Sequence, residues 1–437
     1  MDPLGDWRRT HGAGEIGPGL DGQETIIGGW IHETRDLGNL CFIVLRDRTG
    51  IAQITLLKKK HGELFTRLSQ LPRESVVLVK GNVKASEKAK LGAEVLPTEA
   101  KVLGEAKTPL PLGVADKVGA DLDTRLDNRY MDLRKPEVMA IFKIRATILE
   151  AVREVLLGQK FVEVNTPKIV ATATEGGTAL FPMEYFERPA FLNQSPQLYK
   201  QILMASGLDR VMEIGPAFRA EEHDTTRHLN EFTSIDIEMA FSDEEDAMHM
   251  LELVVDGAIR KVKEKNETEL KLLDIELPEQ ELPYPRVSYT ECIQMVKNAG
   301  LDIDWGEDLS MEATKIIAEK LPPFYFITRW PSAEKPFYAL PYDDKPEECR
   351  AFDLNYKEKE VTSGAQRVHN PSLLKERIGN QGLDVDSFKF YLDAFEYGMP
   401  PHAGWGLGTE RLVMILTGQN NVRECVLFPR DQKRLVP

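Results

Sequence analysis

The chain has 437 residues, enough for two or three domains that each bury a core, and 42% hydrophobic with 29% charged residues is an ordinary composition for a water-soluble chain. Its 55 basic and 70 acidic residues give a formal net charge of −15, which excludes uniform coating of nucleic acid but allows a local basic groove. The first 100 residues carry 14 basic and 13 acidic side chains, so the acidic excess lies in the remainder. The N-terminal part could therefore bind an anion that the rest of the chain would repel.

The cysteines and the N-terminus indicate the compartment. Cys41, Cys292, Cys349 and Cys425 are isolated, with no CxxC pair and no histidine at zinc-site spacing. We interpret them as reduced thiols of a cytoplasmic protein. The N-terminus has no apolar signal-like region, and no run approaches the roughly 18 apolar residues of a membrane span, so we expect no membrane partner.

In chain order, residues 1–22 are rich in glycine and polar residues and predict a flexible tail. Five short β-rich runs follow within residues 23–105, separated by turn signals, and predict a small five-stranded barrel. Residues 106–134 have the composition of a linker. From residue 135 to 437 the pattern mixes strands and helices, and Pro136 stands at the first position of a long apolar-periodic helix.

Three segments of the larger domain carry the chemistry. KFVEVNTPKIV (160–170) is a strand-like run that contains a proline, and by itself it fits a buried strand with an edge proline. FRAEEHDTTRHLNEF (218–232) lies between two strand-like runs and predicts a hairpin with a charged loop. GMPPHAGWGLGTERLVMILTG (398–418) places a glycine-rich turn before an apolar helix, and its glycines would allow a ligand to approach the backbone.

The hairpin is the most informative of the three, although its loop could simply be solvated. At the strand period of two, Arg219 and Glu221 share a face, and an arginine fork fixed there suits phosphate oxygens. Glu221 could accept a hydrogen bond from an exocyclic amine, and Phe232 on the returning strand could stack on a base. Together these residues predict a nucleotide site.

With TP at 166–167, FRAE at 218–221 and GLGTER at 406–411 in this order, the chain resembles the class II aminoacyl-tRNA synthetases. Within that class, TEGGTALF, QSPQLYKQ, EVTSGAQRVH and the closing LFPRDQKRLVP are similar to the archaeal type of aspartyl-tRNA synthetase. The resemblance runs from about residue 24 to the end. It implies an α+β fold in which an N-terminal OB-fold barrel precedes a six-stranded antiparallel catalytic sheet flanked by helices, and it implies a homodimer.

The resemblance also implies an aspartate–tRNA ligase, which makes aspartyl-adenylate from L-aspartate and ATP and transfers the aspartyl group to the 3′-hydroxyl of the terminal adenosine of tRNA. Arg219 would hold the α-phosphate and the carboxylate as the catalytic residue, Glu221 would read the adenine amino group, and Arg411 would hold the γ-phosphate end. Such catalysis depends mostly on positioning the two substrates and on compensating the charge that develops in the transition state. The expected ATP site comprises Arg219, Glu221, Arg227, His228, Leu229, Phe232, Glu360 and Arg411, and Mg²⁺ would be bound by Glu360 and Ser363.

The amino-acid pocket implied by the resemblance has two cations for the substrate side chain, Lys200 and Arg367, and burying them against an uncharged amide would be unfavourable. Lys200 could alternatively be a solvated helix lysine. The full expected set for aspartate is Glu175, Gln197, Lys200, Asp236, Ser363 and Arg367, with Asp236 facing the substrate ammonium. Thr362, Ala365 and Thr409 depart from the residues expected in the family without removing a charged contact.

The barrel would read the tRNA anticodon through Arg35, Phe42 and Gln53, with Phe42 as a stacking platform unless it is barrel core. The basic run 58–60 could contact the tRNA backbone or only solubilise a turn. Some relatives accept only tRNA(Asp), with a histidine early in the first strand and a proline in a facing loop. Trp30, Lys88 and Lys90 stand here instead and predict that tRNA(Asn) is also charged, for an amidotransferase to finish, unless Trp30 is core.

Three alternatives remain at this point. An asparaginyl-tRNA synthetase is disfavoured by Lys200, and an asparagine synthetase built on the same catalytic fold is disfavoured by the barrel. A catalytically silent paralogue that binds tRNA or a partner protein is disfavoured by Arg219, Glu221 and Arg411.

Overall fold

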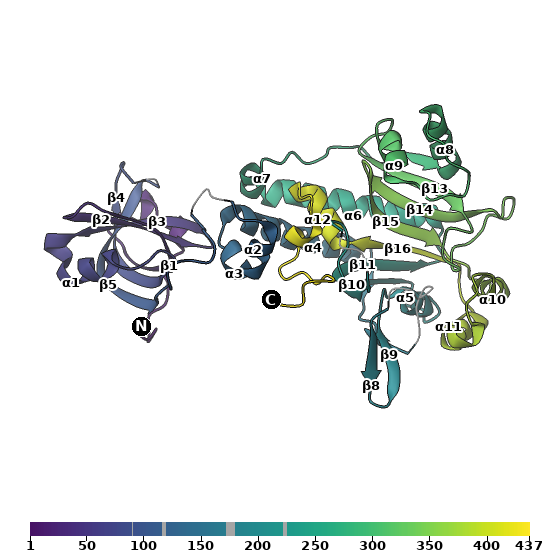
Figure 1. The fold of residues 1–437 in the computed structure, drawn as a ribbon, viewed down its shortest axis with the longest axis horizontal. Coiled ribbons are helices and arrows are strands. Elements are labelled where there is room, and N and C mark those ends of the chain that lie inside the picture. The colour runs from purple at the N-terminus through teal and green to yellow at the C-terminus, as the bar shows by residue number, and fades with distance from the viewer. Residues whose placement is uncertain (90, 116–118, 172–179, 222–224) are drawn as a thin grey trace. The chain divides into compact units, whose positions relative to one another are not determined.

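A computed structural model describes residues 1–437 except 90, 116–118, 172–179 and 222–224 (Figure 1). The chain divides into two compact units, Met1–Lys135 and Pro136–Pro437. This division falls one residue from the predicted start of the larger domain. Among the described residues no helix has the length and apolar character needed to cross a bilayer.

The first unit contains a closed barrel, as the five β-rich runs predict. Its strand order is β1-β2-β3-β5-β4, and β3 and β5 pair in parallel while the other neighbours are antiparallel. Side chains alternate along the strands, so Cys41, Ile43 and Leu45 fill the core while Phe42 lies on the outer face. The elements are β1 (Glu24–Asp36), β2 (Leu40–Asp47), β3 (Gly50–Leu57), α1 (Lys58–Ser69), β4 (Val76–Ala85) and β5 (Ala93–Gly104).

The flexible tail predicted for residues 1–22 is wrong, because this segment packs on the barrel. Short 3₁₀ helices form at Ala13–Glu15 and Pro18–Leu20, and Ala13 and Ile16 are buried in the barrel core. The glycines that suggested flexibility instead permit close packing, since a Cβ on Gly14 would overlap the carbonyl oxygen of Thr49.

The predicted linker contains structure of its own. Helices α2 (Leu122–Asp127) and α3 (Arg129–Asp132) lie within it, and Arg129 and Asp132 form a fully buried ion pair at 2.8 Å. Just beyond α3, Arg134 donates to Glu74 of the barrel at 2.9 Å. The segment before the larger unit is therefore attached to the first unit through charged contacts.

The second unit is α+β, with helices on a large sheet (Figure 1). Its N-terminal half contains α4 (Pro136–Gly158), β6 (Val162–Glu163), β7 (Ile169–Val170), β8 (Pro182–Tyr185), β9 (Arg188–Leu192), α5 (Gln197–Met204), β10 (Arg210–Phe218), β11 (Glu231–Ala240), α6 (Glu244–Lys265) and α7 (Glu267–Leu273). The C-terminal half contains β12 (Arg286–Ser288), α8 (Tyr289–Asn298), α9 (Met311–Ala318), β13 (Phe324–Pro331), β14 (Glu348–Tyr356), β15 (Lys359–Gln366), α10 (Pro371–Asn380), α11 (Lys389–Glu396), β16 (His402–Gly408) and α12 (Thr409–Thr417).

The sheet corrects the prediction of six antiparallel strands. It has eight strands in the order β12-β13-β14-β15-β16-β11-β10-β6. The six inner strands pair antiparallel, but β12 and β6 each join an edge in parallel. Both edge strands are short, and the chain crosses over to the parallel partner through helices, α8 and α9 between β12 and β13, and α5 between β6 and β10. Parallel neighbours require such a crossover connection.

One face of this sheet is apolar and the other is polar. Ile235, Ile237, Trp405 and Leu407 belong to a single core with residues of α4, α6 and α12. The residues that alternate with them along the strands lie on the opposite face of the sheet. These residues include Asp236 and Glu238 on β11 and three glycines on β16, Gly404, Gly406 and Gly408. The polar face is where the predicted site residues gather.

Candidate active site

A cavity of about 310 Å³ lies over the polar face of the sheet, within the size range of small-molecule sites. Its walls come from the β10–β11 hairpin, the start of α5, β15, β16 and the start of α12. Every predicted ATP-binding residue lines it, namely Arg219, Glu221, Arg227, His228, Leu229, Phe232, Glu360 and Arg411. Gln197, Asp236, Ser363 and Arg367 line it as well, whereas Glu175 lies outside the described residues.

The hairpin is present, but Arg219 and Glu221 do not share a strand face. Strand β10 ends at Phe218, and the backbone then turns because the Asn230 side chain donates to the Arg219 carbonyl at 2.8 Å. The Arg219 backbone N–H donates in return to the Asn230 carbonyl at 2.9 Å. The Arg219 guanidinium lies 5.3 Å from the centre of the Phe232 ring, so the two residues share one wall of the cavity.

The cavity is cationic at its hairpin end, where Arg219, Arg227 and Arg411 converge. Burial lowers the pKa of His228; nearby Glu221 raises it, and the arginines lower it further. His228 is therefore neutral at pH 7, and its Nδ1 forms a hydrogen bond with the Thr225 hydroxyl at 2.7 Å. Three arginines facing one another in a half-enclosed space suit a polyphosphate.

Two carboxylates, Asp353 on β14 and Glu360 on β15, lie near these arginines. Arg411 donates from Nη1 to Glu360 Oε1 at 3.1 Å. Asp353 lies directly across the β14–β15 ladder from Ser363. Its Oδ2 accepts a hydrogen bond from Lys335 Nζ at 2.6 Å, while its buried Oδ1 has no hydrogen-bond partner among the described residues. Burial raises the pKa of Asp353; Lys335 opposes this change and Glu360 adds to it.

A divalent cation fits this corner. The orphaned oxygen of Asp353, the Glu360 carboxylate and the Ser363 hydroxyl are hard oxygen donors, and a cation beside them would relieve the repulsion between the carboxylates. Within the described part of the chain, no three or more His, Cys, Asp or Glu side chains could hold a metal ion by themselves. The corner therefore suits an ion that shares its coordination with phosphate oxygens.

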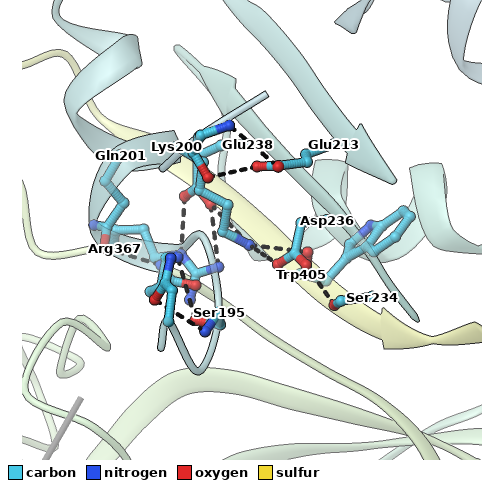
Figure 2. A network of polar contacts seen from close by, with 12 residues as sticks. Ser195, Lys200, Gln201, Glu213, Ser234, Asp236, Glu238, Arg367 and Trp405 are labelled. Atoms are coloured by element: carbon cyan, nitrogen blue, oxygen red, sulfur yellow. Dashed lines mark hydrogen bonds and ion pairs between the residues drawn. The ribbon is translucent and has the colours of Figure 1, made fainter. Parts of the chain in front are cut away.

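Of the two predicted substrate cations, Arg367 lines the cavity, whereas Lys200 does not and contacts the lining residue Asp236. Both cations belong to a compact network of four charges (Figure 2). Lys200 is buried on α5 and donates to Asp236 Oδ1 at 2.9 Å and to the Trp405 carbonyl at 3.0 Å. Arg367 is equally buried and donates to Glu238 from Nε at 2.9 Å and from Nη2 at 3.3 Å. The alternative of a solvated Lys200 is therefore wrong.

Asp236 lines the cavity and also has partners within the protein. Its carboxylate accepts from Lys200 and from the Ser234 hydroxyl, so it positions Lys200 in addition to lining the cavity (Figure 2). Glycine at alternate positions of β16 leaves room for these carboxylates. A Cβ on Gly406 would lie 3.0 Å from Asp236 Oδ1, and one on Gly404 would overlap the Glu238 carboxylate.

The barrel presents the predicted anticodon residues on one face. Arg35 pairs with Phe42 across β1 and β2, and Phe42 pairs with Thr55 on β3. Phe42 is half-buried and is not among the buried core residues, so the core alternative does not describe it. Gln53 lies nearby on β3 and donates to Glu94 at 3.1 Å. The basic run 58–60 opens helix α1 rather than a turn.

Trp30 lies apart from Arg35, Phe42 and Gln53. It pairs with Arg46 and Val76, and the Arg134 guanidinium covers its ring at 5.1 Å from the centre. The ring is half-buried and therefore neither core nor a free stacking surface. Lys88 is exposed in the β4–β5 turn, and Lys90 lies outside the described residues.

Comparison with known proteins decides the family. Residues 121–432 match the family described as tRNA synthetases class II (D, K and N), and residues 25–103 match the OB-fold nucleic acid binding domain. The chain belongs to the class II tRNA synthetases. This synthetase is an aminoacyl-tRNA ligase, and tRNA, ATP and an amino acid are its substrates.

Full-length relatives agree with this assignment. The aspartate–tRNA(Asp/Asn) ligase of Methanocaldococcus jannaschii is 57% identical over 99% of both chains, and that of Archaeoglobus fulgidus is 55% identical over 97% of this chain and 99% of its own. The solved asparaginyl-tRNA synthetase of Pyrococcus horikoshii with asparaginyl-adenylate superimposes with a TM-score of 0.93 at 34% identity, covering 98% of this chain and all of the other. The aspartyl-tRNA synthetase of Entamoeba histolytica does so with 0.88 at 31%, covering 98% and 93%.

Two functional candidates of this synthetase were missed by sequence reasoning. Glu238 continues the alternation of Asp236 along the otherwise apolar run IDIEMAF, and Asp353 is the only polar residue in the run AFDL. An acidic residue inside a buried strand is rarely placed there without a partner, so both were available as signals.

Proposed function

We propose that this synthetase activates L-aspartate with ATP and transfers it to tRNA(Asp) and also to tRNA(Asn). The observation that carries the choice of amino acid is the buried pair of cations, Arg367 in the lining of the cavity and Lys200 paired with the lining residue Asp236. Three relatives that are 54–57% identical over 97–100% of this chain are aspartate–tRNA(Asp/Asn) ligases, which supports the same choice.

The aspartate side chain would add a third carboxylate to this network. Arg367 donates to Glu238 through Nε and Nη2 and also lines the cavity, so its Nη1 group would be the one to bind the substrate carboxylate. Lys200 Nζ donates to Asp236 and to a backbone carbonyl and lies 3.6 Å from Glu238 Oε2, so the substrate carboxylate would share its positive charge with these two acids. Asparagine would offer an uncharged amide to these cations and bind less favourably.

At the other end, the arginines would place ATP for attack by the substrate's α-carboxylate on the α-phosphorus. That carboxylate is already ionised, so the reaction needs no protein base. Arg219 would compensate the charge that grows on the α-phosphate during the attack, while Arg411 would hold the terminal phosphates. Phe232 and Glu221 form the wall for adenine.

Glu360, Ser363 and Asp353 would hold Mg²⁺ beside the phosphates. When bound, this ion neutralises charge on the departing pyrophosphate. Arg411 is fixed by Glu360, so the same carboxylate orients a phosphate-binding arginine and contributes to the cation site.

Charging of purified transcripts tests the complete proposal. Relaxed tRNA specificity predicts that tRNA(Asp) and tRNA(Asn) are aspartylated with efficiencies within about tenfold, because an indole and a flexible lysine do not select one hydrogen-bonding edge. The aspartylated tRNA(Asn) would then be a substrate for an amidotransferase. A preference for tRNA(Asp) above about a hundredfold, near 3 kcal/mol, would contradict this interpretation of Trp30 and Lys88.

We also infer a cytoplasmic homodimer. All four cysteines are free and buried, which suits a reducing compartment. Leu157, Val162 and Ile169 expose apolar side chains around Pro167, and β6 is a sheet edge that a second copy could cover.

Light scattering checks the assembly. A two-fold contact through this segment predicts a particle of about twice 49.3 kDa. Replacing Val162 with Asp on the edge strand should shift the equilibrium toward monomer, whereas a monomeric wild-type enzyme that is fully active at nanomolar concentration would remove this role from the segment.

A further inference from the structure

Behind the amino-acid end of the cavity lies a second buried polar network that the proposed reaction does not use directly. Gln197, Gln201, Tyr391 and His402 are at most 5% exposed and come from α5, α11 and β16. Gln197 and Gln201 are one helical turn apart, and Gln197 alone of the four lines the cavity.

The hydrogen-bond directions in this network follow from one fixed end. His402 Nδ1 lies 2.8 Å from the Pro400 carbonyl, which can only accept, so Nδ1 carries the proton. Burial lowers the pKa of His402 to about 4, so its ring is neutral at pH 7 and Nε2 is an acceptor. The Gln201 amide, 3.0 Å away, must therefore present its nitrogen to His402.

This orientation determines the next one. With its nitrogen directed at His402, Gln201 presents its oxygen to Gln197, whose Nε2 donates to it at 2.9 Å. The Tyr391 hydroxyl donates to the same oxygen at 3.1 Å and supports that orientation. Gln197 has thus used its nitrogen end inside the protein, and its carbonyl oxygen is the end that remains for the cavity.

We propose that Gln201, His402 and Tyr391 are positioning residues that fix the Gln197 amide with its oxygen toward the cavity, where it accepts a hydrogen bond from the substrate's α-ammonium group. An inverted amide would direct an N–H at that cation and repel it. The network therefore selects for an α-amino acid over the corresponding acid without the amino group. This inference rests on the proposed function, since it takes an amino acid as the ligand of this end of the cavity.

The test compares aspartate with succinate, which has the same two carboxylates and no ammonium. Gln201→Met removes the acceptor that holds the Gln197 nitrogen. We expect the KM for aspartate in pyrophosphate exchange to rise about tenfold, with the KM for ATP and the inhibition constant of succinate changed by less than about twofold. Equal weakening of aspartate and succinate would show a general disturbance of the pocket and overturn the proposal, as would an unchanged KM for aspartate.

A milder variant covers the possibility that Gln201→Met does not fold. Tyr391→Phe keeps the ring and removes one donor to the Gln201 oxygen, and it should raise the KM for aspartate about threefold without affecting succinate. Its control is Tyr199→Phe, because Tyr199 lies on the same helix as Gln201 but packs against Phe390, and this variant should leave both constants unchanged. Equal shifts for aspartate and succinate in Tyr391→Phe would again overturn the role.

Failure of the proposed amino acid is visible separately in the wild-type enzyme. If exchange depends on asparagine instead of aspartate, the proposed function is wrong, and the same variants are compared with asparagine and its deamino analogue succinamate. An ammonium-dependent shift with that pair would support the positioning role, and its absence would overturn it.

Discussion

Arg219→Ala is expected to reduce aspartate-dependent pyrophosphate exchange by about two orders of magnitude or more. Of the three arginines at the hairpin end of the cavity, Arg219 is the only one whose backbone N–H and carbonyl both bond to Asn230, among the bonds of the described residues. Such a rigidly placed cation acts on charge that grows in the transition state, so its loss should lower kcat more than it raises the KM for ATP.

Two companion variants make this measurement specific. Arg219→Lys keeps the charge and loses the fork, so an intermediate rate is expected. Arg260→Ala removes an arginine that is exposed on α6, where it pairs with Asp256, and should leave exchange unchanged. Near-normal exchange by Arg219→Ala would contradict the assignment of the hairpin as the nucleotide site.

Lys200→Met is expected to impair the use of aspartate more strongly than Arg219→Ala does. It would leave the Asp236 carboxylate buried with Ser234 as its remaining partner and place a third carboxylate, that of the substrate, beside Glu238. We expect kcat/KM for aspartate to fall by about a thousandfold, near 4 kcal/mol, because truncating one partner of a buried ion pair is costly. The preference for aspartate over asparagine should shrink at the same time.

The measurement is exchange with each amino acid in turn, together with the melting temperature of the variant. Lys263→Met, in an exposed pair with Glu279, is the matched control and should match the wild type in both. A folded Lys200→Met enzyme that still prefers aspartate as strongly as the wild type would show that Lys200 does not select the substrate.

The sequence was sufficient to predict the barrel, because strand alternation is a local property. The residues that the family resemblance assigned to ATP do line one cavity, and their binding of ATP stays a prediction. The sequence failed where distant parts of the chain determine the structure. The glycines of residues 1–22 suggested flexibility, yet Gly14 is glycine because the backbone of Thr49 lies against it. The parallel edge strands β6 and β12 are only two and three residues long, too short to give a periodic signal.

The candidate site also depends on contacts between distant parts of the chain. Strand period placed Arg219 and Glu221 on one face, but a side chain twelve residues beyond Phe218, Asn230, ends the strand pairing there by bonding the turning backbone. Lys200 and Arg367 could be chosen from their motifs, whereas their pairing with Asp236 and Glu238 depends on how α5, β11 and β15 meet. Partners of buried charges belong to the tertiary structure and cannot be read from spacing alone.

The central claim is that the buried network of Lys200, Arg367, Asp236 and Glu238 selects aspartate, and pyrophosphate exchange by the wild-type enzyme tests it most directly. With ATP and Mg²⁺ present, exchange should depend on L-aspartate, and the same concentration of L-asparagine should support at least about a hundredfold less. Exchange that depends on asparagine, or that occurs equally with both amino acids, would contradict the assignment of Lys200 and Arg367 as the residues that recognise the substrate side chain.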